Sequence, residues 1–295
     1  MNEAAKKELE YQKNLERIRQ LRLMDDDFFQ VCMQDNVKAV QLLLRIIIDD
    51  PGLVVTKAVT QKEMKNLLGH SLCLDVYAVD AKGQRINVEI QRKDPGAVPE
   101  RAVCHSAMLD ANSLAKGEQD FRKKAETYTI MITENDVLGG KLPIYHVERV
   151  VLELDKAPFG GKSHIIYVNG AYDGSGKSNL EWLIHDFRCK EPSDMHFQEL
   201  AERVRYFKEE SEGIKVMCKI WEDVKDEGRA EGRVEGRAEG RVEGRAEGRV
   251  EGRAEGKAEM VVEMLKEKQP LDFIARISNF SQEKIAEIGK LHGVL

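Results

Sequence analysis

Polar and apolar residues alternate along two neighbouring stretches of the chain, 72–80 and 84–91, with the period of two that a β-strand requires. The turn-forming segment 80–83 joins them and ends in a glycine, which suits the left-handed position of a three-residue hairpin loop. These patterns predict a β-hairpin. Counting outward from its loop sets Asp75 directly opposite Glu89.

The same register divides the hairpin into two faces, because successive side chains of a strand point to opposite sides. It sets Tyr77 opposite Asn87 and groups Asp75, Glu89 and Gln91 on one face. The other face is apolar, and we expect it to pack inward. Its members are Leu72, Leu74, Val76, Ile86, Val88 and Ile90.

Helical periodicity before and after the hairpin predicts the layers that cover it. Residues 1–24 carry a thin apolar stripe typical of a surface helix, and 27–48 carry a richer stripe that ends at a Pro-Gly pair. A β-branched run at 53–59 predicts a first strand. Strands interleaved with helices predict an α/β fold, a mixed sheet flanked by helices. Beyond the hairpin, helices are predicted at 98–115, 180–187 and 196–221, and strands at 128–133, 144–154 and 164–168.

A repeat of Glu-Gly-Arg-Ala and Glu-Gly-Arg-Val fills residues 227–258. Four residues advance about 400° on an α-helix, so each residue type winds around the axis by about 40° per repeat. A glycine in every repeat also costs roughly 1 kcal/mol against alanine. We therefore expect a helical or disordered spacer, or a weak self-association arm. Because Glu balances Arg, a nucleic-acid arm is disfavoured.

The last segment, 259–295, is predicted to form short helices, with Ser281 starting the final one. This tail is either a small helix-turn-helix that touches DNA or an oligomer contact. Its low basic content favours the contact, so we expect a homo-oligomer formed through the repeat and the tail.

Composition sets outer limits on the protein class. The 295 residues are 42% hydrophobic and 33% charged, which allows one sizeable domain with polar extensions. No apolar run is long enough to span a membrane, and the N-terminus lacks a signal-peptide core, so we expect a cytoplasmic protein without a membrane partner. The five cysteines are scattered and predict neither a zinc site nor a disulfide framework.

The two opposed carboxylates are the first candidate chemistry. Like charges that face each other on a sheet are destabilising by up to roughly 1 kcal/mol. Such a pair is tolerated when a cation lies between the two groups, and oxygen ligands of this kind suit Mg2+. The alternative is that Asp75 and Glu89 are two ordinary solvated strand residues.

The net charge of −6 does not by itself favour DNA, because affinity for phosphates comes from clustered Lys and Arg. A local basic cluster is still compatible with DNA binding. Arg92, Lys93 and Arg101 follow the hairpin closely and are the candidate DNA contacts.

The hairpin contains a lone Asp75, then a turn, then Val88-Glu89-Ile90-Gln91. This pattern resembles the catalytic hairpin of the PD-(D/E)XK nuclease superfamily. The resemblance is to its family of recombination-promoting nucleases and transposases, whose strand motif is commonly Glu-x-Gln. Further segments resemble that family in order within residues 25–220. These segments are 99–101, 106–110, Leu114, Gly117, 127–132, 143–145 and 165–169.

The resemblance implies a restriction-endonuclease-like sheet and a set of site residues. Asp75 and Glu89 would bind Mg2+ or Mn2+, with the Ile90 carbonyl oxygen as a further ligand. Gln91 would position the attacking water. It stands where most of the wider superfamily has a lysine, and a glutamine does not supply a positive charge there.

These inferences predict a Mg2+-dependent endonuclease that hydrolyses the phosphodiester bonds of DNA and is associated with recombination or transposition. The alternative is a catalytically weak or inactive nuclease-fold protein that acts as a regulatory or oligomeric DNA-associated assembly factor. The predicted parts are a charged N-terminal helix at 1–24, a nuclease-like domain at 25–222, the repeat spacer at 223–258 and the helical tail at 259–295.

Three other features carry weaker signals. The segment 170–178 resembles a phosphate-binding loop, but its spacing is one residue too long, so a glycine-rich turn is the preferred interpretation. His105 shares a helix side with Arg101, and we expect a structural role for it. His185, Asp186 and His196 have no specific metal spacing, and we expect ordinary surface and helix-terminal roles.

Overall fold

The computed structural model describes residues 3–65 and 71–295, and the first two residues of the predicted N-terminal helix lie outside these ranges. The chain divides into two compact units, Met1–Lys219 and Ile220–Leu295. The α-helices are α1 (Glu3–Gln20), α2 (Asp26–Met33), α3 (Val37–Ile47), α4 (Pro99–Ala111), α5 (Asn179–Arg188), α6 (Gln198–Glu209), α7 (Ser211–Lys266), α8 (Leu271–Ser278) and α9 (Gln282–Leu291).

The first unit contains a six-stranded sheet in the order β1-β2-β3-β4-β8-β5. The strands β1, β2 and β3 are antiparallel neighbours, β3, β4 and β8 run parallel, and β5 is antiparallel to β8. This confirms the predicted mixed α/β fold. The strands are β1 (Val55–Met64), β2 (Leu72–Asp80), β3 (Arg85–Gln91), β4 (Thr127–Thr133), β5 (Ile144–Val147), β6 (Val150–Val151), β7 (Ala157–Pro158) and β8 (Ser163–Asn169), and β6 pairs with β7 in a small second sheet.

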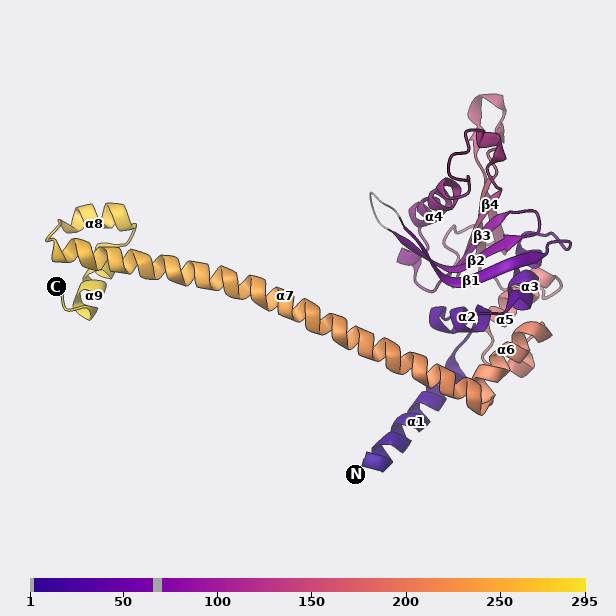
Figure 1. Ribbon diagram of the computed structural model, residues 1–295, viewed down its shortest axis with the longest axis horizontal. Coiled ribbons are helices and arrows are strands. Elements are labelled where there is room, and N and C mark those ends of the chain that lie inside the picture. The colour runs from indigo at the N-terminus through magenta and orange to yellow at the C-terminus, as the bar shows by residue number, and fades with distance from the viewer. Residues whose placement is uncertain (1–2, 66–70) are drawn as a thin grey trace. The chain divides into compact units, whose positions relative to one another are not determined.

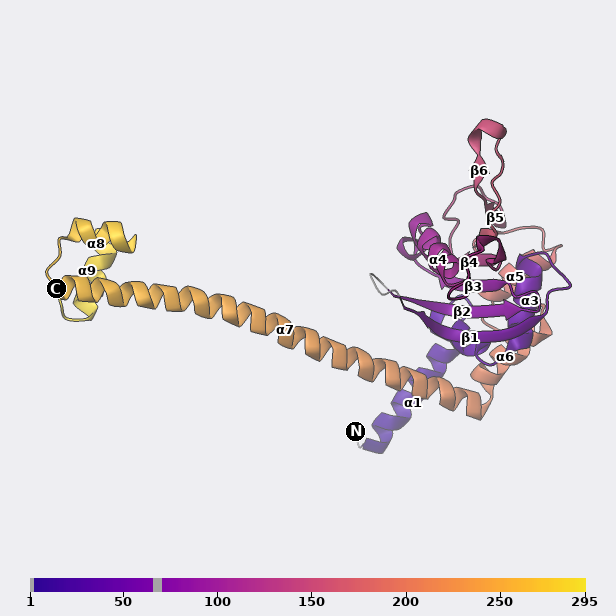
Figure 2. The same cartoon turned by 45° about the horizontal axis from the view of Figure 1, so that its top comes forward.

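Helices cover both faces of the main sheet (Figures 1 and 2). Helix α4 packs on β4 and β8 from one side, while α2 and α3 pack on β1 and β2 from the other, with α5 and α6 behind them. The alternative that Asp75 and Glu89 are ordinary solvated strand residues is therefore wrong, since both are buried. Asn87 and Glu89 are fully buried, because α4 lies over the side that carries them.

The predicted hairpin register is confirmed in the part where the two strands pair. Tyr77 pairs with Asn87, and the Asp80 N–H donates to the Gln84 carbonyl oxygen across the turn. Gly83 has a φ of 79°, the left-handed conformation that the turn pattern predicted. The local sequence therefore determined both the turn and the pairing.

The single helix predicted at 27–48 is two helices. Asp35 adopts a left-handed φ of 54°, and the Asn36 side chain accepts the Ala39 N–H as the cap of α3. The strand predicted at 144–154 is also interrupted: β5 ends at Val147, and Val150–Val151 pairs with a different partner. In both places a short break divides a stretch whose apolar pattern is continuous.

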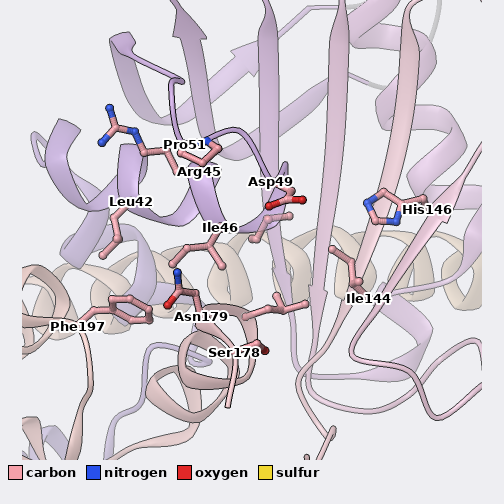
Figure 3. Close-up of a pocket in the computed structure, with 12 residues that line it drawn as sticks. Leu42, Arg45, Ile46, Asp49, Pro51, Ile144, His146, Ser178, Asn179 and Phe197 are labelled. Atoms are coloured by element: carbon pink, nitrogen blue, oxygen red, sulfur yellow. The ribbon is translucent and has the colours of Figure 1, made fainter. Parts of the chain in front are cut away.

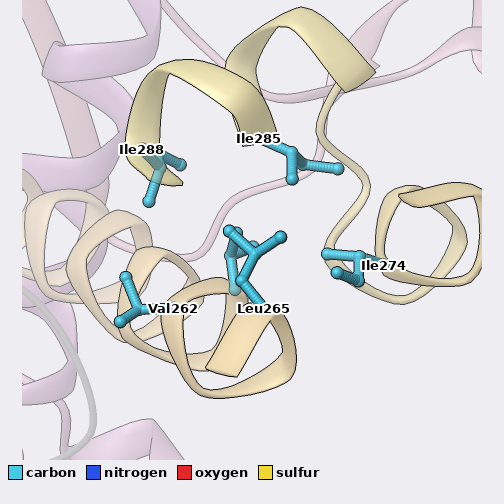
Figure 4. Packing of buried hydrophobic residues seen from close by; sticks show 6 residues of the cluster. Val262, Leu265, Ile274, Ile285 and Ile288 are labelled. Atoms are coloured by element: carbon cyan, nitrogen blue, oxygen red, sulfur yellow. The ribbon is translucent and has the colours of Figure 1, made fainter. Parts of the chain in front are cut away.

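The second unit is built around the C-terminal part of α7. The Glu-Gly-Arg repeat lies within this continuous helix. After the end of the repeat, still within α7, Val262 and Leu265 pack against Ile274 of α8 and against Ile285 and Ile288 of α9 (Figure 4). The Ser281 hydroxyl accepts the Lys284 N–H, so α9 begins where the sequence predicted. Within the described residues, no helix is both long enough and apolar enough to cross a membrane.

Candidate active site

The two hairpin strands separate at the predicted carboxylates. Backbone pairing of β2 with β3 ends at Val76 and Val88. Beyond that point the Asp75 carboxylate accepts the Ile90 backbone N–H at 3.0 Å, so a side chain replaces the next bond of the ladder. On the other side of β2, in strand β1, Gln61 has a left-handed φ of 50°. Its neighbours Thr60 and Lys62 still pair regularly with β2. The sheet therefore opens at Asp75.

Glu89 lies in this opening and is surrounded by polar groups from β3 and α4. Its Oε1 accepts a hydrogen bond from Asn87 Nδ2 at 3.0 Å and lies 3.4 Å from the Asp75 backbone nitrogen. The His105 Nδ1 is 3.3 Å from the same oxygen. Arg101, whose side chain is 42% exposed, lies 3.6 Å from Oε2. Two residues of α4 thus hold the buried glutamate from the solvent side.

Helix α2 brings a third carboxyl group to the opening. Gln30 Nε2 lies 3.4 Å from Asp75 Oδ1 and donates to Asp26 Oδ1 at 2.7 Å. Burial raises the pKa of Asp26, and the nearby Asp27 and Glu89 act in the same direction, against the hydrogen bond from Gln30. The amide of Gln30 thus links two acids that lie far apart in the sequence.

The opening is electrostatically unfavourable for carboxylates alone. Burial, followed by repulsion from Glu89 and Asp26, raises the pKa of Asp75 to about 8. Glu89 Oε2 is buried and has no hydrogen-bond partner among the described residues. Hard oxygen ligands that are crowded and incompletely paired fit a divalent cation such as Mg2+. The residues present therefore fit such an ion.

The remaining predicted site residues lie at different distances from this opening. Gln91 is two residues beyond Glu89 on β3, and its side chain lies against Gly96, where a Cβ would come within 2.1 Å of Oε1. Lys93 is exposed at the start of the following turn. Arg92 is held by two acids: its Nη1 is 2.8 Å from Asp25, and its Nε is 3.2 Å from Glu134.

Sequence reasoning missed three members of the site. Asn87 was detectable, because it precedes Glu89 by two residues on the same alternating face. Asp26 and Gln30 had no local signal, since only the packing of α2 on β2 brings them near Asp75. His105, for which a structural role was expected, contacts Glu89 directly.

The segment that resembles a phosphate-binding loop forms a helix start. The Lys177 backbone N–H donates to Glu181 at 2.9 Å, and the Ser178 hydroxyl accepts the Glu181 N–H at 3.2 Å. This is a capping arrangement in which a carboxylate of the chain takes a backbone N–H that a phosphate would need. The contacts agree with the glycine-rich turn expected from the spacing.

A cavity of about 640 Å³ lies elsewhere in the first unit, between α3, β5 and the start of α5 (Figure 3). Leu42, Ile46 and Ile144 give it apolar walls, while Asp49 and His146 lie on one side. Its lining includes neither carboxylate of the β2–β3 opening. The cavity is therefore a separate feature from the candidate site.

Comparison with known proteins identifies the central part of the chain. Residues 36–171 match the model of the family described as PD-(D/E)XK nuclease family transposase. No curated protein and no solved structure matches the chain. The matched segment begins at the cap of α3 and ends just after β8, so it contains Asp75, Glu89 and Gln91. Nucleases of this superfamily generally use divalent metal ions.

Proposed function

From the PD-(D/E)XK nuclease-family transposase domain that residues 36–171 form, we propose that this protein is a Mg2+- or Mn2+-dependent DNA endonuclease that acts in recombination or transposition. The observation that carries the proposal is the buried pair of Asp75 and Glu89 at the point where β2 and β3 separate. A buried pair of acids with a raised Asp75 pKa, in which one Glu89 oxygen accepts no hydrogen bond, is stabilised by a cation.

The metal ligands would be the carboxylates of Asp75 and Glu89 and the backbone carbonyl of Ile90. In a strand, the N–H and the carbonyl of one residue point to the same edge. Because the Ile90 N–H bonds to Asp75, its carbonyl is directed to the same opening. When bound, such an ion polarises a phosphodiester and lowers the pKa of a water molecule.

The side chains around the pair would orient the reactants. Gln91 accepts and donates hydrogen bonds without carrying charge, so it can hold a water molecule in place for attack on phosphorus. Asn87 and His105 fix the Glu89 carboxylate from one side. Arg101 is half exposed beside Glu89, where its guanidinium can meet a phosphate oxygen. Lys93 is the second candidate phosphate contact, and Arg92 would first have to leave its two acids.

A plasmid-cleavage assay tests the proposal. Wild-type protein with Mg2+ or Mn2+ should convert supercoiled plasmid to nicked and linear forms, and chelation should stop the reaction. Asp75→Asn and Glu89→Gln should each remove the activity. Glu126→Gln is the matched control, because Glu126 immediately precedes β4 and bonds to Gln84 and His164 away from the opening. Cleavage by both site variants at the wild-type rate would refute the assignment.

One observation favours the second candidate, a nuclease-fold assembly or regulatory factor. The residue at the superfamily's usual lysine position is Gln91, and it is neutral. Under that candidate, the chain would bind metal and DNA without cutting, and Gln91→Lys would create activity where the wild type has none. Cleavage by the wild type that Gln91→Lys does not increase would exclude it.

A further inference from the structure

A second group of metal-ligating side chains lies at the end of α5 and in the segment that leads to α6. At its centre is Asp186, which is fully buried. One carboxylate oxygen accepts the His196 backbone N–H at 2.8 Å, and the other accepts the Phe197 N–H at 2.9 Å. The carboxylate is therefore held in a fixed orientation by the backbone of a segment ten residues away.

Two imidazoles converge on the same oxygen of Asp186. His196 Nδ1 is 3.1 Å and His185 Nδ1 is 3.4 Å from Oδ1, and the ligand atoms of the three residues lie within 4.8 Å of one another. Trp182 stacks on His196 with the ring planes 7° apart, which fixes that imidazole. The imidazole of His185 is half exposed and meets the His196 ring edge-on.

A thiol lies beside the group, outside the three residues whose ligand atoms all come within 4.8 Å of one another. Cys189 follows His185 by four residues at the end of α5, and its Sγ lies 3.3 Å from His185 Nδ1. Residues four apart lie on the same side of a helix, so the short spacing brings sulfur and imidazole together. The three residues offer two nitrogen atoms and one oxygen, and a rotation of the Cys189 side chain would add a sulfur atom. These are the ligand types of zinc sites.

Three of the distances between candidate ligand atoms agree with a common tetrahedral centre. Ligand atoms at about 2.1 Å from a zinc ion are about 3.4 Å apart at a tetrahedral angle, and a nitrogen and a thiolate sulfur about 3.6 Å apart. The separations of Asp186 from the two imidazoles and of His185 from Cys189 lie close to these values. The backbone bonds to Asp186 are the outer contacts that orient a metal ligand.

We propose that His185, Asp186, Cys189 and His196 bind a zinc-class divalent ion. Three ligands are already together, and Cys189 would turn inward as the fourth. Four protein ligands close the coordination sphere, so the role is structural. The ion fastens α5 to the segment that enters α6. The hydrogen bonds of Asp186 alone would also hold this segment, but they do not require two imidazoles and a thiol around one oxygen. The inference is independent of the β2–β3 site, whose ligands are all oxygen atoms.

Cobalt substitution of the full chain tests this site without reference to cleavage. Co2+ bound by imidazole and thiolate gives tetrahedral visible bands and a thiolate-to-cobalt charge-transfer band, which an all-oxygen site lacks. We expect one equivalent of Co2+ to produce both signals and Zn2+ to remove them. Cys189→Ala should lose the charge-transfer band, and His185→Ala should bind the ion more weakly. Cys104→Ala and His146→Ala are the matched controls and should retain both signals.

Thermal unfolding gives a second measurement in case a variant folds poorly. Zn2+ should raise the melting temperature of the wild type and of both controls, and raise it less in Cys189→Ala and His185→Ala. The absence of a charge-transfer band in well-folded wild type would overturn the proposal. So would an unchanged band in Cys189→Ala.

Discussion

Asp75→Asn measures the electrostatic cost of holding two acids in the β2–β3 opening. The asparagine keeps an oxygen for the Ile90 N–H and removes the charge that faces Glu89. In the folded chain the pKa of Asp75 is raised from 3.8 to about 8, by burial first and then by Glu89 and Asp26. A group with a raised folded-state pKa stabilises the fold below its unfolded pKa, and this contribution is lost as the pH rises through about 8.

The magnitude follows from the size of that shift. At about 1.4 kcal/mol per pKa unit, the full effect at pH 8 is roughly 5 kcal/mol, and at pH 5 it is roughly 1.5 kcal/mol. Part of this free energy is repulsion that Asp75 shares with Glu89, so we assign about half of the free energy at each pH to Asp75. The metal-free variant should therefore be more stable than the wild type by about 2–3 kcal/mol at pH 8 and by less than about 1 kcal/mol at pH 5.

Urea unfolding in the presence of a chelator at the two pH values provides the assay. Asp136→Asn is a control of opposite sign. The pKa of Asp136 is lowered, since hydrogen bonds from Tyr145 and backbone N–H groups outweigh the opposing effect of burial. Its removal should destabilise the fold more at pH 8 than at low pH. Equal stability of Asp75→Asn and wild type at pH 8, or a gain that does not grow with pH, would refute the reasoning. Added Mg2+ should stabilise the wild type more than Asp75→Asn.

Three further changes test other parts of the reasoning. Gly96→Ala should lower the cleavage rate, because the new Cβ would displace the Gln91 amide. The Mg2+ concentration that gives half-maximal activity should not change. An unchanged rate in single-turnover assays would deny Gln91 a role. Lys177→Ala should leave cleavage unchanged and independent of nucleotide, since the backbone of that loop caps α5; ATP binding that the variant loses would contradict this. A chain that ends at Asp226 should still cut DNA but contain fewer copies per particle, as measured by light scattering. It should also nick plasmid more than it linearises it, because cutting both strands is easiest with two sites held together. An unchanged number of copies and an unchanged product ratio would exclude an assembly role for the repeat and tail.

The hairpin was predictable because its information is local. The alternation of β2 and β3 and the left-handed Gly83 fix the register without help from the rest of the chain. The break between α2 and α3 was missed because the apolar pattern continues across it, and only the Asn36 cap marks the new start. The burial of Glu89 was missed because alternation cannot show whether a second helical layer covers the polar face.

The composition of the site shows why a neutral residue at position 91 is compatible with metal binding. Arg101 places one positive charge 3.6 Å from Glu89, and Gln30 binds the two other acids through a neutral amide. A lysine at position 91 would add a second positive charge, which would stabilise the ionised pair without metal and reduce what a cation gains by binding. With Gln91, the Glu89 oxygen that accepts no hydrogen bond and the raised pKa of Asp75 remain, and both favour the binding of a divalent ion.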